Sequence, residues 1–411
     1  MTPAERDLSE VLVIERELWQ DGPPHELFRQ LRGKCPVHWS PEIPDFPDQD
    51  GFWSVTTADH VHTVSRDWET FSSELGGITA LTGAILPLEL VRAMFIGMDP
   101  PKHDRLKALF QRGFTPKRIA DHEDSIRSIT VETLDSLADR QTCDLVADVA
   151  QPVVSRVIGS FMGIPPQDDA VWARLMNATV GAGDRDLNPD GPGSVVQREV
   201  PEIFARCREL IAARREHPTD DLTSVLVHAE IDGEHLEEHE IVMGFVLLMA
   251  AGNDSTKATY CSGMLAIMED PEQRRLLLED PSLVDGAVEE SLRMFPAFAH
   301  FRRTATRDCE LGGQRIREGE KVVMWYASSN RDESRYEDPD RFEIRRNPEH
   351  QAFGAGGRHF CLGTALARLE LRTLFAETLA RYPGIALAGR PSHAESPWIN
   401  QLKSLPVTLR P

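Results

Sequence analysis

Past the middle of the chain, a run of apolar residues is followed abruptly by a run of polar residues. Residues 241–251 read IVMGFVLLMAA and would be apolar on every face of a helix. Such a helix is buried in a protein core, and the run is too short for a bilayer, which takes ~20 residues. Residues 252–256, GNDST, then add groups that compete for backbone hydrogen bonds. The pattern predicts a buried helix over 241–265 with a local distortion at the polar step.

Turn-forming residues mark other elements. Residues 44–61, PDFPDQDGFWSVTTADHV, predict a turn and the strands of a small sheet, after which helical stretches resume. Two long loops are expected. The first, over 76–100, is largely apolar, and the second, over 181–193, reads GAGDRDLNPDGPG and is rich in helix-breaking residues.

Composition narrows the partners and the compartment. The formal net charge of −21 disfavours nucleic acid and anionic membranes as ligands. The N-terminal sequence MTPAERDLSEVLVIERELW is acidic and amphipathic, unlike a signal or an anchor, so we expect a cytoplasmic protein without a membrane anchor. The cysteines have no CxxC pair or framework spacing, which argues against disulfides and zinc; they are Cys35, Cys143, Cys207, Cys261, Cys309 and Cys361.

Residues 353–363, FGAGGRHFCLG, hold a cysteine in a glycine-rich segment whose backbone can approach a large flat ligand. The segment resembles the haem-thiolate signature of the cytochrome P450 family, with Gly357 and His359 at expected positions. By that match Cys361 ligates the haem iron, and a thiolate ligand favours O–O cleavage. The alternative is a buried structural cysteine. Phe353 lies eight positions before Cys361, one more than is usual, so we predict a small bulge where the loop begins.

The resemblance covers most of the chain and implies its architecture. It implies one P450 domain over residues 1–411, mainly α with small β-sheets. A long central helix would cover the haem, and the loop of the cysteine ligand would lie beneath it. This outweighs the two or three domains that the length alone suggests. The implied cofactor is haem b, with O2 as co-substrate, and we expect a monomer.

A second motif supports the match. Glu290 and Arg293 fit the family's E-x-x-R pair, whose side chains share one face of a helix. Alone, such spacing is common on surface helices. Its place before the cysteine, and the intervening residues 329–346, SNRDESRYEDPDRFEIRR, give it weight. The resemblance implies a third partner for the pair, which is either Arg345 or Arg346.

The resemblance also assigns residues around the haem. Asp254 and Ser255 match the acid–alcohol pair that manages proton delivery during oxygen activation, with Thr256 next to them and Gly252 beside the cofactor. Ser255 stands where threonine is usual. The alternative is a buried helix that needs a polar kink. The haem carboxylates need cationic or hydrogen-bonding partners when buried, and four residues match those positions: His103, Lys107, Arg303 and His359. Lys107 replaces an expected arginine and lacks its bidentate fork.

These residues predict a monooxygenase that hydroxylates a small apolar molecule. The sequence around 251–256 and 346–357 looks most like the branch of the family that oxidises steroids, terpenoids and branched lipids. Three alternatives stay open: a tailoring hydroxylase or epoxidase of secondary metabolism, a peroxide-driven haem-thiolate enzyme, and a haem sensor or carrier. Asp254 and Ser255 argue against the last two, which need no oxygen-activating groove.

Two surfaces complete the expectation. A ferredoxin, fed by a ferredoxin reductase, would dock on the locally basic segment 102–118 together with Arg358, Arg368 and Arg372. The substrate pocket is expected to be lined by apolar side chains: Ile78, Leu81, Ile85, Leu86, Leu88, Met94, Phe245, Met249, Phe298, Phe301 and Trp398.

Overall fold

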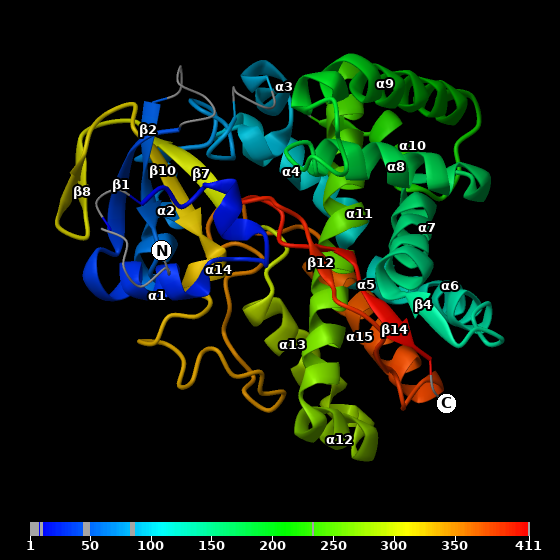
Figure 1. The fold of residues 1–411 in the computed structure, drawn as a ribbon. Coiled ribbons are helices and arrows are strands. Elements are labelled where there is room, and N and C mark those ends of the chain that lie inside the picture. The colour runs from blue at the N-terminus through cyan, green and yellow to red at the C-terminus, as the bar shows by residue number, and fades with distance from the viewer. Residues whose placement is uncertain (1–7, 9–10, 44–49, 83–86, 232–233, 410–411) are drawn as a thin grey trace.

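The structure is a computed structural model that describes residues 8, 11–43, 50–82, 87–231 and 234–409. It is mainly helical with small sheets, as predicted. Its main sheet gathers on one side, and its longer helices lie on the other (Figure 1). The helices are α1 (His25–Lys34), α2 (Ala58–Arg66), α3 (Leu88–Arg92), α4 (Lys102–Gln111), α5 (Pro116–Asp121), α6 (Glu123–Asp135), α7 (Gln151–Met162), α8 (Asp169–Val180), α9 (Pro192–Glu216), α10 (Leu222–Val227), α11 (Glu238–Glu269), α12 (Pro271–Glu279), α13 (Val284–Met294), α14 (Tyr326–Ser329) and α15 (Thr364–Arg381).

Five 3-10 helices and one π-helix, η6, lie between them in the described residues: η3 (Arg16–Trp19), η4 (Phe95–Gly97), η5 (Arg112–Phe114), η6 (Leu145–Ala150), η7 (Pro166–Asp168) and η8 (Pro281–Leu283). The strands are β1 (Val37–Glu42), β2 (Asp50–Val55), β3 (Phe71–Ser72), β4 (Thr142–Asp144), β5 (Glu230–Ile231), β6 (Glu234–His235), β7 (His300–Ala305), β8 (Cys309–Leu311), β9 (Gln314–Ile316), β10 (Lys321–Trp325), β11 (Ala386–Leu387), β12 (Ser392–His393), β13 (Leu402–Ser404) and β14 (Pro406–Thr408).

The main sheet has the order β1-β2-β10-β7-β3, and β10 runs parallel to β2 and antiparallel to β7. Side chains alternate between its two faces. Val323 and Trp325 pack in one apolar cluster with residues of η3 and α1, whereas Val322 and Met324 pack in another with α2. Within the predicted range 44–61 the structure has one strand, β2, and helix α2 begins at Ala58, so the sheet is confirmed but only one of its strands lies in this range; residues 44–49, where the turn was predicted, lie outside the described residues.

Helix α11 organises the helical side (Figure 1). A capping box between Glu237 and Glu240 starts it, and its apolar first half is buried against α7 and α8 while later turns meet α13 and α15. The buried helix is confirmed. The helix is continuous from Glu238 to Glu269, and a local distortion within it at 252–256 stays a prediction.

One helical stretch in the described residues has the length and hydropathy to span a membrane. This stretch, Leu145–Met162, comprises η6 and α7, and 67% of it is buried inside the fold. Its apolar side chains contact α6, α8 and α11. The stretch therefore serves as a helix of the protein core.

The two predicted loops contain more order than the sequence suggested. Segment 76–100 includes α3 and η4, while residues 83–86 lie outside the described residues. Segment 181–191 is fixed by polar side chains: Asp184 Oδ2 lies 3.3 Å from Lys403 Nζ, and Asn188 Nδ2 donates to the carbonyl of Gly181 at 2.9 Å. A lid role for this segment stays a prediction.

Candidate active site

A large internal cavity lies between α11, the loop around Cys361 and strand β7. Helices α4, α7, α13 and α15 add side chains to its wall. Most of the wall is apolar, and its larger apolar members include Phe95, Ile96, Phe114, Ile158, Leu247, Leu248, Leu292, Phe298 and Phe301. The cavity thus combines an apolar chamber with the glycine-rich loop.

The glycine-rich loop adopts backbone angles that other residues rarely adopt. Gly354, Gly356 and Gly357 have φ values of 92°, 86° and 85°. A Cβ on Gly357 would also lie 2.7 Å from the carbonyl oxygen of Ser65, so both strain and space require glycine there. The backbone N–H of Cys361 donates to the carbonyl of Phe353 at 2.9 Å, which closes the loop on itself.

The Cys361 side chain is exposed to the cavity, while atoms of the surrounding fold enclose it on its other sides. Burial raises the pKa of this thiol, while a hydrogen bond from the Gly363 backbone and the charges of Lys107 and Arg368 act in the opposite direction. These three groups would all favour a thiolate once a cation faces it. Phe353 packs under the Arg368 guanidinium, 4.8 Å from the ring centroid, and so supports the loop from behind.

Basic side chains gather at one end of the same cavity. His103 and His359 lie with their ring centroids 4.2 Å apart, and Arg303 and Lys107 line the wall beside them. His103 Nδ1 lies 2.9 Å from Asp104 Oδ1, but its Nε2 is buried and has no hydrogen-bond partner. Burial lowers the pKa of both histidines, and Arg303 and Lys107 lower them further. The arrangement is suited to a buried anion.

Lys107 is bonded to the cysteine loop, and its predicted contact with the haem stays a prediction. Its ammonium donates to the carbonyl of Phe360 at 2.8 Å and to that of Arg358, both in the cysteine loop. An ammonium carries three donors, so one remains for the cavity. Lys107 therefore ties α4 to the loop, a role that the sequence did not suggest.

The polar step of α11 divides its side chains between two environments. Ser255 and Thr256 line the cavity, and Ser255 Oγ donates to the carbonyl of Ala251 at 2.7 Å. Asp254 is buried outside the cavity wall, with Lys257 Nζ 2.5 Å from its Oδ1. Gly252 also lines the cavity, where a Cβ would meet Ile158 of α7 at 2.8 Å, so glycine allows the two helices to approach.

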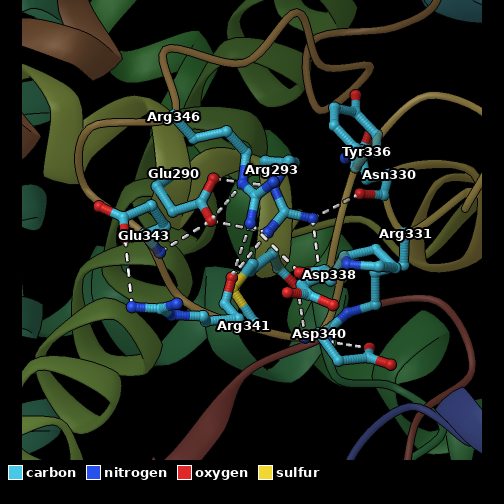
Figure 2. A network of polar contacts seen from close by, with 12 residues as sticks. Glu290, Arg293, Asn330, Arg331, Tyr336, Asp338, Asp340, Arg341, Glu343 and Arg346 are labelled. Atoms are coloured by element: carbon cyan, nitrogen blue, oxygen red, sulfur yellow. Dashed lines mark hydrogen bonds and ion pairs between the residues drawn. The ribbon is translucent and has the colours of Figure 1, made fainter.

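The E-x-x-R pair of α13 is fully buried in a polar network (Figure 2). Arg293 Nε and Nη2 donate to Glu290 Oε2 and Oε1 at 2.8 and 2.7 Å. Arg346 Nε donates to Glu290 Oε1 at 3.1 Å, and Figure 2 shows both arginines directed toward the Glu290 carboxylate. The third member of the triad is therefore Arg346, whereas the backbone of Arg345 bonds to Glu343.

Comparisons with known proteins agree with this geometry. The sequence model of the cytochrome P450 family matches residues 196–385. The methyl-branched lipid omega-hydroxylase of Mycobacterium tuberculosis strain H37Rv is 37% identical over 416 residues, which cover 99% of this chain and 96% of that protein. The chain belongs to the cytochrome P450 family. It is a P450 monooxygenase, and the predicted fold class is confirmed.

Two further relatives place this P450 within the family. The steroid C26-monooxygenase of Rhodococcus jostii is 32% identical, with 93% of this chain and 81% of that protein aligned. A Mycobacterium marinum cytochrome P450, solved in complex with pseudoionone, superposes with a TM-score of 0.90 at 37% identity, over 96% of this chain and 97% of that one.

The P450 family implies a haem, and the cavity fits one. Cys361 offers sulfur to the cavity, Gly354 and Gly363 line the same wall without side chains, and the unpartnered Nε2 of His103 beside Arg303 matches the demand of a buried carboxylate. The basic end and the cysteine loop occur in one cavity, as a haem with two carboxylates requires.

The structure of the P450 also shows a cavity residue that sequence reasoning missed. Glu370 of α15 is buried, lines the cavity, shares a hydrogen bond with Thr256 and leaves its Oε2 without a partner. Burial raises its pKa to about 8, so the side chain is mostly neutral at pH 7. Charged residues of this type are rarely fully buried, but nothing in the sequence marked this one among 66 acidic residues.

The predicted pocket lining was largely wrong. Of the predicted residues, Phe298 and Phe301 line the cavity, whereas Ile85 and Leu86 lie outside the described residues. From α11 the wall receives Leu247 and Leu248 instead of the predicted Phe245 and Met249. The predicted residues that do not line it are Ile78, Leu81, Leu88, Met94, Phe245, Met249 and Trp398.

Proposed function

We propose that Cys361 would ligate the iron of haem b as a thiolate and that His103, His359 and Arg303 would hold its carboxylates. The unpartnered Nε2 of His103, next to a buried guanidinium, carries this assignment. When bound, a thiolate-ligated haem supplies the iron centre that activates O2. Lys107 is assigned to the cysteine loop, which it ties to α4 through the carbonyls of residues 358 and 360.

The hydroxyl of Ser255 and the carboxylate of Asp254 would then manage protons. Ser255 faces the cavity and can exchange its hydrogen bond to the Ala251 carbonyl for one to a molecule in the cavity. Thr256 is held by Glu370 and is the second hydroxyl at this wall. Because serine lacks the methyl group of threonine, its hydroxyl rotates more freely.

We infer that the substrate is an apolar lipid or steroid that is hydroxylated in the chamber. The observation that carries this inference is the apolar wall above the cysteine loop. It agrees with relatives named as a methyl-branched lipid omega-hydroxylase and a steroid C26-monooxygenase. Titration of the ferric protein with a branched fatty acid and with a sterol, followed through the Soret band, would test it. A saturable shift of the Soret band with either ligand supports the inference, and an unchanged Soret band with both ligands opposes it.

An acidic electron donor such as a ferredoxin would dock near the cysteine loop. The structure weakens part of the predicted docking face, since four of its arginines already face carboxylates: Arg105, Arg358, Arg368 and Arg372 pair with Glu240, Asp104, Glu289 and Asp285. Arg66 is exposed, forms no ion pair within the part of the chain that the structure describes, and lies next to Gly356 and Gly357 of the loop. We therefore assign donor steering to Arg66.

Stopped-flow reduction across a salt series tests the docking proposal. Arg66→Glu should slow haem reduction at low salt. The difference in rate between this variant and the wild type should disappear at high salt, because steering is screened over a Debye length of about 8 Å at physiological ionic strength. The control is Arg390→Glu, whose partner Asp21 belongs to the N-terminal segment, outside this loop. Equal rates for both variants at every salt concentration would reject the assignment.

A further inference from the structure

A lysine buried in the middle of α11 has a role that the motifs did not indicate. Lys257 is 3% exposed, and its Nζ contacts three oxygens: Asp254 Oδ1 at 2.5 Å, Asn177 Oδ1 at 2.7 Å and Gln151 Oε1 at 2.8 Å. All three ammonium donors are therefore used. A buried charge is costly unless it is paired in this way, so the site is built around the lysine.

The same network holds the second oxygen of Asp254. Asn253 Nδ2 lies 3.3 Å from Asp254 Oδ2, and the side-chain Oδ1 of Asn253 accepts from Ser155 Oγ at 2.8 Å and from Gln151 Nε2 at 3.1 Å. The carboxylate is thus held on the α7 and α8 side of α11. Ser255, the next residue, faces the cavity on the other side.

This network borders a depression that opens to solvent. Gln151, Ser155 and Asn177 line the depression, which lies between α7, α8 and the start of α9. Two other carboxylate oxygens at its wall, Asp169 Oδ1 and Glu199 Oε2, are buried without a partner. Buried acceptors of this kind are usually satisfied by ordered water, so the depression can carry water to the network.

We propose that Lys257 is a positioning residue that keeps the Asp254 carboxylate turned toward the depression. Protons enter from water in the depression, past Gln151 and Asn177, and reach this carboxylate. Asp254 then passes them to Ser255. Each proton comes from water in the depression, binds the carboxylate and leaves it for the cavity, so Asp254 ends each cycle ionised. The inference rests on the proposed proton role of Asp254 and Ser255 and adds the side from which protons arrive.

Substitutions of Lys257 test the positioning role in the holoenzyme. Lys257→Arg keeps a cation next to the carboxylate and should retain most of the coupled turnover. Lys257→Met removes it, and coupled turnover should fall about tenfold, a part of the 10²–10⁴ that proton transfer contributes. Similar turnover in wild type and Lys257→Met would overturn the proposal, and so would equal losses in both variants.

Infrared spectroscopy gives a readout that does not depend on turnover. Without its cation, Asp254 should take up a proton, so Lys257→Met should show a protonated carboxyl band that Lys257→Arg and the double variant with Asp254→Asn lack. The appearance of the same band in the double variant would contradict the assignment.

The entry route is tested separately. Asn177→Leu should increase the kinetic solvent isotope effect on turnover while substrate binding stays unchanged, and Arg174→Gln, at the exposed rim of the same depression, should not. An unchanged isotope effect in Asn177→Leu would reject this route. If Asp254→Asn itself left turnover and coupling intact, the proposed proton role of Asp254 would fail, which is a different result from failure of the Lys257 variants alone.

Discussion

Replacement of Arg293 by methionine should destabilise the protein more than any exposed arginine substitution nearby. The Arg293 guanidinium is fully buried, donates to both oxygens of Glu290 and to the carbonyls of Asn330 and Pro339 at 2.9 and 2.8 Å, and lies 5.0 Å from the ring centroid of Tyr336. It therefore joins α13 to the segment after α14, as Figure 2 shows. Methionine removes all of these contacts at once.

The expected loss is large because Glu290 stays buried. Removing one partner of a buried pair costs about 3–5 kcal/mol, chiefly because the other charge is left uncompensated. Arg346 still reaches Glu290 through one bond at 3.1 Å, which places the expected loss near the lower end of that range. Against a total stability of roughly 5–15 kcal/mol, this is enough to unfold a substantial fraction of the protein on mild heating.

Urea unfolding of the holoprotein, followed by far-UV circular dichroism and by the Soret band, measures the loss. Arg341→Met is the matched control, since its side chain is 56% exposed and lies 3.5 Å from Glu343. An exposed pair contributes about 0–1 kcal/mol. The reasoning is refuted if Arg293→Met lowers the unfolding midpoint no more than Arg341→Met does.

Other variants test the cavity. The pKa of Glu370 is raised from 4.5 to about 8 in the fold, so the unfolded chain releases this proton first, and stability should fall as pH rises through that interval. Glu370→Gln should remove this part of the pH dependence, which urea titrations at pH 5 and pH 8 would show. Ser255→Ala should divert reducing equivalents into peroxide, measured as peroxide formed per electron donor consumed; unchanged coupling would move the role to Thr256 or to water. His103→Leu should lower haem retention under dilution more than the exposed control His62→Leu does.

The spacing of residues that are close in sequence was sufficient to predict much of the site. The cysteine loop and the E-x-x-R pair depend on residues close in sequence, and the buried part of α11 followed from a continuous apolar run. Spacing could not decide between Arg345 and Arg346. The turn at Asn347, with a φ of 48°, and the carbonyls of residues 337, 338 and 341 orient Arg346 toward Glu290. Backbone carbonyls leave no mark on a sequence.

Long-range packing decided the rest. The side of α11 that faces the cavity depends on how α7 and α8 pack against it, so the lining residues of α11 were misplaced although the helix was correctly predicted. Lys257 bonds to Gln151 and Asn177, which lie 106 and 80 positions away from it in the sequence. Glu370 is equally invisible, since its burial arises only when α15 packs on α11.

The reduced carbon-monoxide spectrum tests the central claim most directly. The haem-loaded protein should show the red-shifted Soret band of thiolate ligation, and Cys361→His should lose it while haem remains bound. Cys309→Ser, at a half-buried cysteine of strand β8, should keep the band unchanged. A red-shifted band that survives in Cys361→His would contradict the assignment of Cys361 as the haem ligand and, with it, the account of this site.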